Sequence, residues 1–185
     1  MVTVAMEAIF LYGYFFILLL LSIFGFHRYY TIYNYREYKD NVPKAKGSFD
    51  QLPKVCVQLP VYNEMYVVER LIDAVAKIDY PKELFEIQVL DDSTDDTVSI
   101  AKAKCDEIAA AGLNIKHIRR GDRKGFKAGA LKFGQDMTDA DFIAVFDADF
   151  LPPSDFLKRT IHFFTVEKIG MVQARWDHLN RDFSL

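Results

Sequence analysis

The stretch FIAVFDAD, residues 142–149, places five apolar residues directly before two aspartates that are separated by one alanine. A short apolar run of this kind predicts a buried β-strand. Because side chains alternate between the two faces of a strand, we expect Asp147 and Asp149 to point to one side. Paired carboxylates are hard oxygen ligands that suit Mg²⁺ or Mn²⁺. The pair alone does not decide this, because Asp149 can equally begin a turn before Pro152 and Pro153.

Short apolar runs and longer amphipathic runs continue on both sides of this stretch. They predict strands over residues 55–59, 85–90, 115–118, 142–146 and 170–174, and helices over residues 65–78, 94–111, 126–135 and 155–166. Strands and helices that alternate along a chain are typical of an α/β fold, with helices on both faces of an open, mostly parallel sheet. The sequence therefore predicts a Rossmann-like arrangement.

Polar side chains follow four of the predicted strands. Tyr62, Asn63 and Glu64 follow the first, Asp91 and Asp92 close the second, residues 119–127 follow the third, and Asp147 and Asp149 follow the fourth. Open α/β sheets bind ligands at the carboxyl ends of their strands, where the loops gather. We therefore expect these side chains to form one site.

Two of the acidic residues after the second strand differ from the two that close it. Ser93 and Asp96 have the spacing of a helix N-cap and its third residue, and Asp95 adds negative charge at the same helix start. We therefore exclude Asp95 and Asp96 from the site. Asp91 and Asp92 precede this cap, and a carboxylate there can accept hydrogen bonds from a nucleotide's base or ribose.

The segment 116–132 is strongly basic. It holds seven Lys or Arg residues against one acid, Asp122, with glycines at positions 121, 125 and 129. Glycines allow close backbone approach, and a helix that begins near Phe126 can direct its amides and Lys127 at phosphate oxygens. A solvated basic loop, whose arginines merely steer an anionic ligand, is the alternative. The chain as a whole has a net charge of -3, which gives no general attraction to nucleic acid.

The N-terminal region predicts a membrane anchor. Residues 8–26 carry no charge, and nineteen residues at ~1.5 Å each span a ~30 Å hydrocarbon layer. A cleaved signal peptide is disfavoured, because Glu7 replaces the basic leader and no small-residue cleavage site follows. We divide the chain into a stub (1–7), a transmembrane helix (8–26), a juxtamembrane linker (27–53) and a soluble domain (54–185).

Charge predicts the orientation of the anchor. Lys and Arg are absent before the span and follow it at positions 28, 36, 39, 44 and 46. This bias predicts that the soluble domain lies in the cytoplasm. The two cysteines, Cys56 and Cys105, lack the spacing of a zinc or redox motif and are expected to be buried, and the four histidines show no ligand spacing.

Four motifs, taken in order, resemble those of family-2 glycosyltransferases of GT-A fold. They are Val55 through Pro60-Val61-Tyr62-Asn63-Glu64, Leu90-Asp91-Asp92-Ser93-Thr94-Asp95, Lys127-Ala128-Gly129-Ala130-Leu131 and Phe146-Asp147-Ala148-Asp149. The second motif and the stretch Val172–Trp176 (VQARW) make the likeness to cellulose synthase-like mannan and glucomannan synthases the strongest. The resemblance covers about residues 54–180.

The resemblance implies a role for each matching position. Tyr62, Glu64 and either Asp91 or Asp92 would hold the nucleoside of a sugar donor, UDP-glucose or GDP-mannose. Lys127 would meet the diphosphate, and Asp147 with Asp149 would hold Mg²⁺ or Mn²⁺. An acceptor hydroxyl of a saccharide would then attack the anomeric carbon in an inverting transfer that extends a polysaccharide.

The chain departs from the family in one respect. The family's general base, its acceptor motif and its further membrane helices would lie beyond Leu185, and we therefore expect this chain alone to bind donor poorly or hydrolyse little of it, and to be inactive as a transferase. Two alternatives stay open. One is a non-catalytic, membrane-bound interaction module of the same fold, and the other is a polyprenyl-phosphate sugar transferase, which shares the early motifs.

Overall fold

The structure is a computed structural model that describes residues 2–175 and 177. Its internal contacts divide the chain into two units, Met1–Lys44 and Ala45–Leu185. The first unit consists mainly of helix α1, Val2–Tyr38. An 18-residue window within Met6–Tyr38 has a mean hydropathy of 2.3, so α1 is long and apolar enough to cross a membrane, although a signal sequence passes the same test. The helix continues past the predicted span through the basic, tyrosine-rich residues that follow it.

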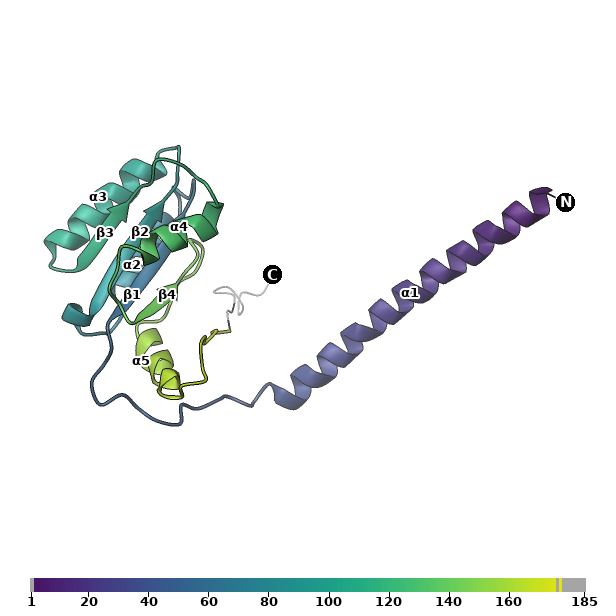
Figure 1. Ribbon diagram of the computed structural model, residues 1–185, viewed down its shortest axis with the longest axis horizontal. Helices are drawn as coiled ribbons and strands as arrows, with labels where there is room; N and C mark the ends of the chain where they lie inside the picture. The colour runs from purple at the N-terminus through teal and green to yellow at the C-terminus, as the bar shows by residue number, and fades with distance from the viewer. Residues whose placement is uncertain (1, 176, 178–185) are drawn as a thin grey trace, which may run out of the picture. The chain divides into compact units, whose positions relative to one another are not determined.

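The second unit is built around a four-stranded parallel sheet with the order β3-β2-β1-β4. Its strands are β1 (Val55–Val61), β2 (Phe85–Asp91), β3 (Asn114–Ile118) and β4 (Phe142–Val145). In register, Val61 of β1 pairs with Asp91 of β2, and Gln58 of β1 pairs with Val145 of β4. The four strands confirm the first four predicted ones, and their carboxyl ends meet at one edge of the sheet (Figure 1).

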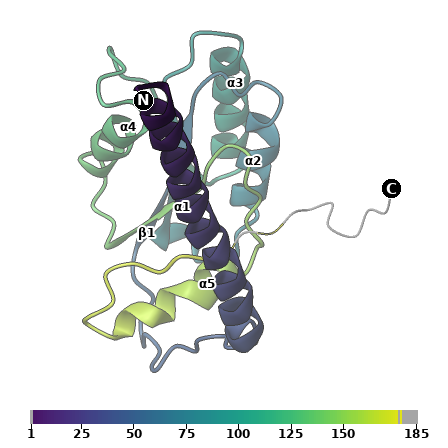
Figure 2. The same ribbon diagram turned by 90° about the vertical axis from the view of Figure 1, so that its right-hand side faces the viewer.

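Helices cover both faces of this sheet, as predicted. Helices α2 (Val68–Ala76) and α3 (Thr97–Ala110) lie on one face, and α4 (Phe126–Gln135) lies on the other (Figures 1 and 2). The main apolar core joins the first face to α2 and α3 through residues such as Leu59, Leu71 and Val89. Side chains alternate between the two faces of a strand, and alternate apolar residues of β1 and β2 point into this core.

The face of the sheet under α4 is more polar, and α4 packs closely against it. Gln58 donates a hydrogen bond to Gln88 at 3.1 Å, and both side chains are buried beneath the helix. A Cβ atom on Gly134 would lie 2.7 Å from the Gln88 Oε1 atom and 2.8 Å from the Gln58 Nε2 atom. A larger residue at this position of α4 would force these buried side chains to shift, so the helix packs closely on the sheet here.

Several predicted boundaries change. The predicted helices 65–78 and 94–111 begin later, at Val68 and Thr97, because side chains and turns occupy the preceding backbone groups. The predicted helix 155–166 is a short α-helix, α5 (Phe156–Thr160), followed by a 3₁₀ helix, η2 (Ile161–Thr165); another, η1 (Lys82–Leu84), precedes β2. The predicted strand 170–174 is wrong, because these residues are irregular and Met171 is exposed. Among the described residues no strand pairs with them to form hydrogen bonds with their backbone.

Candidate functional site

Asp91, the last residue of β2, is an internal anchor of the site. Its side chain is fully buried, with one carboxylate oxygen 2.8 Å from the His117 Nε2 atom and the other accepting the Ser93 N–H at 2.8 Å. Burial alone would raise the pKa of Asp91, but the hydrogen bonds from His117 and Ser93 outweigh it and hold the pKa below its ordinary value. Asp91 is therefore ionised and turned inward, toward β3.

Ser93 and Asn63 join the loops that follow β1 and β2. The Ser93 hydroxyl accepts the Asn63 N–H at 2.9 Å, and the Asn63 side-chain oxygen accepts the Thr94 N–H at 2.9 Å. Asn63 has a φ of 56°, a left-handed conformation that asparagine tolerates better than most residues. This network fixes the backbone on either side of Asn63, and so places Tyr62 and Glu64 at the carboxyl edge.

The predicted pairing of Ser93 and Asp96 at a helix cap is wrong. Helix α3 begins at Thr97, and Asp96 is its N-cap residue without a side-chain hydrogen bond. Asp95 instead accepts the Thr97 N–H at 3.0 Å, so the expectation that it serves the helix start is confirmed. The Ser93 hydroxyl instead accepts the Asn63 N–H, and Ser93 precedes the helix by four residues.

Asp92 is held by an arginine from the loop after β3. Arg120 donates to its two carboxylate oxygens at 2.8 and 2.5 Å, and the two side chains are only 9% and 8% exposed. Hydrogen bonding to Asp92 raises the pKa of the Arg120 guanidinium above its ordinary value. From the sequence, the alternative for this loop was that its arginines are solvated and merely steer an anionic ligand. No sequence signal indicated this pair beyond the position of both residues at neighbouring strand ends.

Lys127 and Asp147 come from different elements and meet at the carboxyl edge. Lys127 is the second residue of α4, Asp147 follows β4, and the ammonium group forms an ion pair with the Asp147 Oδ1 atom. The two side chains are 53% and 46% exposed, so both remain accessible to a ligand. A lysine in the first turn of a helix is a suitable partner for phosphate oxygens, because the helix N-terminus favours anions.

The aspartate pair after β4 lies where burial alternates and where the chain begins to turn. Burial alternates, with Phe146 and Ala148 inside and both aspartates on the more exposed side. A turn also begins here, because the Phe150 N–H donates to the Asp147 carbonyl at 3.0 Å. Within residues 2–175 and 177, no group of three or more His, Cys, Asp or Glu side chains could hold a metal. Two carboxylates nevertheless suit Mg²⁺ or Mn²⁺, which commonly takes its other ligands from phosphates and water.

Tyr62 and Glu64 lie at the same edge with more exposed side chains. The Arg123 guanidinium carbon is 3.3 Å from the centre of the Tyr62 ring, which is 39% exposed, and 5.2 Å from that of Phe126. The Glu64 carboxylate is exposed and has no hydrogen-bonding partner within the described part of the chain, while its carbonyl accepts the Val67 and Val68 N–H groups at the start of α2. Flat aromatic and acidic groups are thus available beside Asp92.

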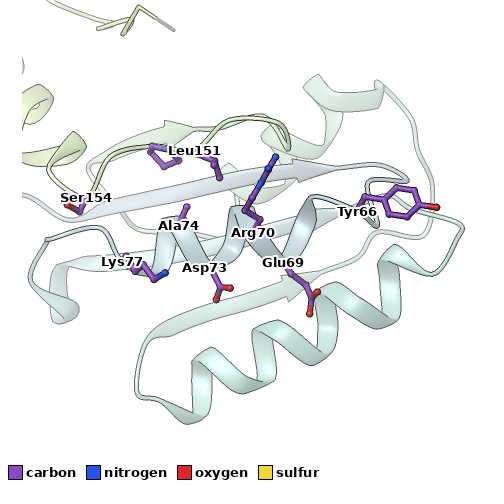
Figure 3. A pocket seen from close by; sticks show the side chains of 9 residues that line it. Tyr66, Glu69, Arg70, Asp73, Ala74, Lys77, Leu151 and Ser154 are labelled. Atoms are coloured by element: carbon purple, nitrogen blue, oxygen red, sulfur yellow. The ribbon is translucent and has the colours of Figure 1, made fainter. Parts of the chain in front are cut away.

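A groove of about 600 Å³ lies beside α2. Its lining comes from α2 and the loop after β4, and Figure 3 shows Arg70 and Leu151 approaching it from the two sides. None of the residues that the sequence assigns to the site lines this groove.

Comparison with known proteins gives one family. The family model "Glycosyl transferase family 2" matches residues 56–184. The chain is 42% identical over 147 residues to "Probable glucomannan 4-beta-mannosyltransferase 7" of Oryza sativa subsp. japonica, covering 77% of this chain and 25% of that protein. It is 40% identical over 158 residues to "Glucomannan 4-beta-mannosyltransferase 1" of Cyamopsis tetragonoloba, covering 83% and 29%. The chain thus spans about a quarter of the length of the curated relatives it matches.

Solved structures share the fold. The mannosyltransferase PcManGT from Pyrobaculum calidifontis, in complex with GDP-Man and Mn²⁺, has a TM-score of 0.61 at 24% identity, covering 75% of this chain and 40% of that chain. S. aureus TarS 1-349 in complex with UDP has a TM-score of 0.52 at 25% identity, covering 65% and 38%. The parallel sheet, the order of its motifs and the matched family model agree, and this chain belongs to glycosyl transferase family 2.

Proposed function

We propose that the Ala45–Leu185 unit binds the nucleotide-sugar donor of a metal-dependent, inverting glycosyl transfer to a polysaccharide. The observation that carries the proposal is the meeting of Lys127 with Asp147 at the open edge of the sheet, beside exposed Asp149. Positive and negative groups side by side there match a diphosphate and the divalent cation that accompanies it. The names of the relatives, which are mannosyltransferases, favour GDP-mannose over UDP-glucose as the donor.

Each site residue then has a role. Tyr62 and Glu64 contact the nucleoside, with Asp92 rather than Asp91, because the Asp91 carboxylate is fully buried and bonded to His117 and Ser93. Lys127 holds the diphosphate, and Asp147 with Asp149 would hold Mg²⁺ or Mn²⁺. As the bond from the anomeric carbon to the diphosphate breaks, negative charge grows on the leaving group, and Lys127 stabilises that charge. A divalent cation held by Asp147 and Asp149 would supply further stabilisation of this charge.

A binding measurement tests this proposal. The full chain, reconstituted in lipid nanodiscs, is titrated calorimetrically with GDP and with UDP, each with and without Mn²⁺. We expect Mn²⁺-dependent binding, and Lys127→Met should weaken it by about 10-fold, which corresponds to ~1.4 kcal/mol. Lys132→Met is the matched control, because Lys132 lies on the same helix and pairs with Asp136 in an exposed position. A folded chain without Mn²⁺-dependent binding would instead support the non-catalytic module.

We also propose that α1 anchors the chain with the soluble unit in the cytoplasm. The basic residues that follow the apolar part of α1, beginning with Arg28 and Arg36, support this orientation. In membrane vesicles of known orientation, a protease added on the cytoplasmic side should cut within residues 121–125, which form an exposed loop before α4. Cleavage from the opposite side alone would contradict the orientation.

A further inference from the structure

Arg120 contacts two separate segments around the site. Besides Asp92, its guanidinium donates to the Lys124 carbonyl at 2.8 Å and to the Phe126 carbonyl at 2.7 Å. All three guanidinium nitrogens are therefore bonded, although the side chain belongs to a loop. One planar cation thus joins the end of β2 to the backbone on which α4 begins.

The backbone that Arg120 holds adopts an unfavourable conformation. Gly125 and Phe126 have φ angles of 74° and 48°, and the second is disfavoured for an aromatic residue. The loop also packs closely on the first turn of α4, because a Cβ atom on Gly129 would lie 2.0 Å from the Lys124 carbonyl oxygen and 2.5 Å from the Arg120 side chain. Such a conformation persists only when its surroundings hold it, and the two carbonyl contacts of Arg120 do so.

Lys127 is the next residue after Phe126, so the placement of its side chain depends on this backbone. Arg120 itself is not bonded to Lys127 or Asp147 in the described contacts. We propose that Arg120 is a positioning residue that couples the nucleoside side of the site, at Asp92, to the diphosphate side, at Lys127. This inference rests on the donor-binding function proposed above.

Arginine suits this role and lysine does not. The guanidinium offers five donors in a rigid plane, which allows a two-pronged contact with Asp92 and simultaneous contacts with two carbonyls. A lysine keeps the charge but offers a single ammonium group. Arg120→Lys should therefore keep part of the ion pair and release the Gly125–Phe126 backbone.

The neighbouring arginine provides a matched control. Arg119 donates to one carbonyl, that of Ser93, at 2.7 Å, and a lysine can replace a single contact of this kind. We compare Arg120→Lys and Arg119→Lys in the full chain in nanodiscs, titrating GDP and guanosine in the presence of Mn²⁺. Arg120→Lys should weaken GDP binding by about 10-fold, the equivalent of one lost charge-assisted hydrogen bond, and change guanosine binding by less than about 2-fold. Arg119→Lys should leave both affinities unchanged.

A double-mutant cycle separates positioning from general loss of structure. In the Lys127→Met background, Arg120→Lys should cause no further loss of GDP affinity, because the group that it positions is absent. Equal losses for GDP and guanosine, or an undiminished loss in the Lys127→Met background, would overturn the inference. Hydrogen exchange supplies the folding check, since amides at residues 121–129 should exchange faster in Arg120→Lys while those of β1 and β2 stay protected.

The two proposals fail in different ways. A wild-type chain that binds neither GDP nor UDP removes the donor-binding function, and this inference falls with it. A wild-type chain that binds GDP while Arg120→Lys binds it equally well leaves the function intact and overturns the coupling alone.

Discussion

Two strands of the sheet, β2 and β4, each lead into a pair of acidic residues, and the two pairs differ in burial and in their partners. After β2, Asp91 is fully buried against His117, and Asp92 is held by Arg120 with little exposure. After β4, Asp147 is half exposed beside Lys127, and Asp149 is exposed in a turn. The first pair is enclosed by the protein's own donors. The second is open to solvent and to ligands.

This difference shows that the position of an aspartate at the end of a strand does not by itself determine what its carboxylate does. β2 lies inside the sheet, between β1 and β3, so its end is surrounded by loops from both neighbours. Among the described residues, β4 is the edge strand and pairs with β1 alone, so its end has a strand neighbour on one side. We expect substitution of the fully buried Asp91 to change stability, and substitutions at the open pair to change ligand binding.

The largest expected effect is on stability, from Asp91→Ala. It leaves His117 and the Ser93 N–H without their partner, and breaking a buried pair in this way costs ~3–5 kcal/mol. Asp147→Ala should cost less than about 1 kcal/mol, because its ion pair with Lys127 is half exposed.

Thiol labelling under increasing urea measures both free energies of unfolding. Burial raises the pKa of Cys56 and of Cys105 to about 12, so each reacts only when the unit opens. Because the reporters lie on β1 and α3, the helical signal of α1 does not enter the measurement. Similar losses for the two alanine variants would break the contrast between the pairs.

The second effect is on binding, from Asp147→Asn. It keeps the shape of the side chain but removes the charge, and should lower the Mn²⁺-dependent affinity for GDP by at least the ~10-fold that altering the surroundings of a metal site costs. Mn²⁺-independent binding should change little, which a titration with the metal chelated would reveal. An unaltered Mn²⁺ dependence would place the cation elsewhere.

The third effect is on acid stability. The pKa of Asp91 is held below its ordinary value, so its stabilising contribution is full above the unfolded pKa of ~4 and is lost as the pH falls through the lower, folded pKa. Burial would raise the pKa of Glu86, but hydrogen bonds from Lys116 and Thr138 outweigh it, and this group acts in the same direction. Unfolding free energies of the wild type should therefore fall below pH ~4, and less steeply in Asp91→Ala. Parallel profiles would show that Asp91 carries no such linkage.

The strands could be predicted from the sequence because their apolar runs are short and strongly bounded. Helix α4 was predicted at its observed bounds, Phe126–Gln135. Gly125, directly before it, takes the left-handed conformation. The later starts of α2 and α3 could not be predicted, because Asn63 and Ser93 bond to each other's loops across the sheet. The local spacing predicted that Ser93 caps a helix, whereas its hydroxyl accepts the N–H of Asn63, thirty positions earlier in the chain.

The candidate site shows the same limit. The gathering of polar residues at the carboxyl edge follows from parallel strands, and the meeting of Lys127 and Asp147 agrees with it. Asp91 and Asp92 could not be distinguished in advance, because adjacent residues of one type differ only in which neighbours enclose them. His117 and Arg120, which make that distinction, lie on or after β3 and are linked to β2 by the fold alone.

The smallest expected effect is that of Asp149→Asn, and it tests how far the open pair acts as a pair. The residue lies in an exposed turn, without a hydrogen-bonding partner for its side chain among the described residues, so binding a cation would have to order it. We therefore expect about a 5-fold loss of Mn²⁺-dependent GDP affinity, roughly 1 kcal/mol and less than for Asp147→Asn. Asp155→Asn, at another exposed position after the same strand, should have no effect. If Asp149→Asn also binds GDP and Mn²⁺ as the wild type does, the carboxylate serves the turn, and Asp147 is the cation's single protein ligand of this pair.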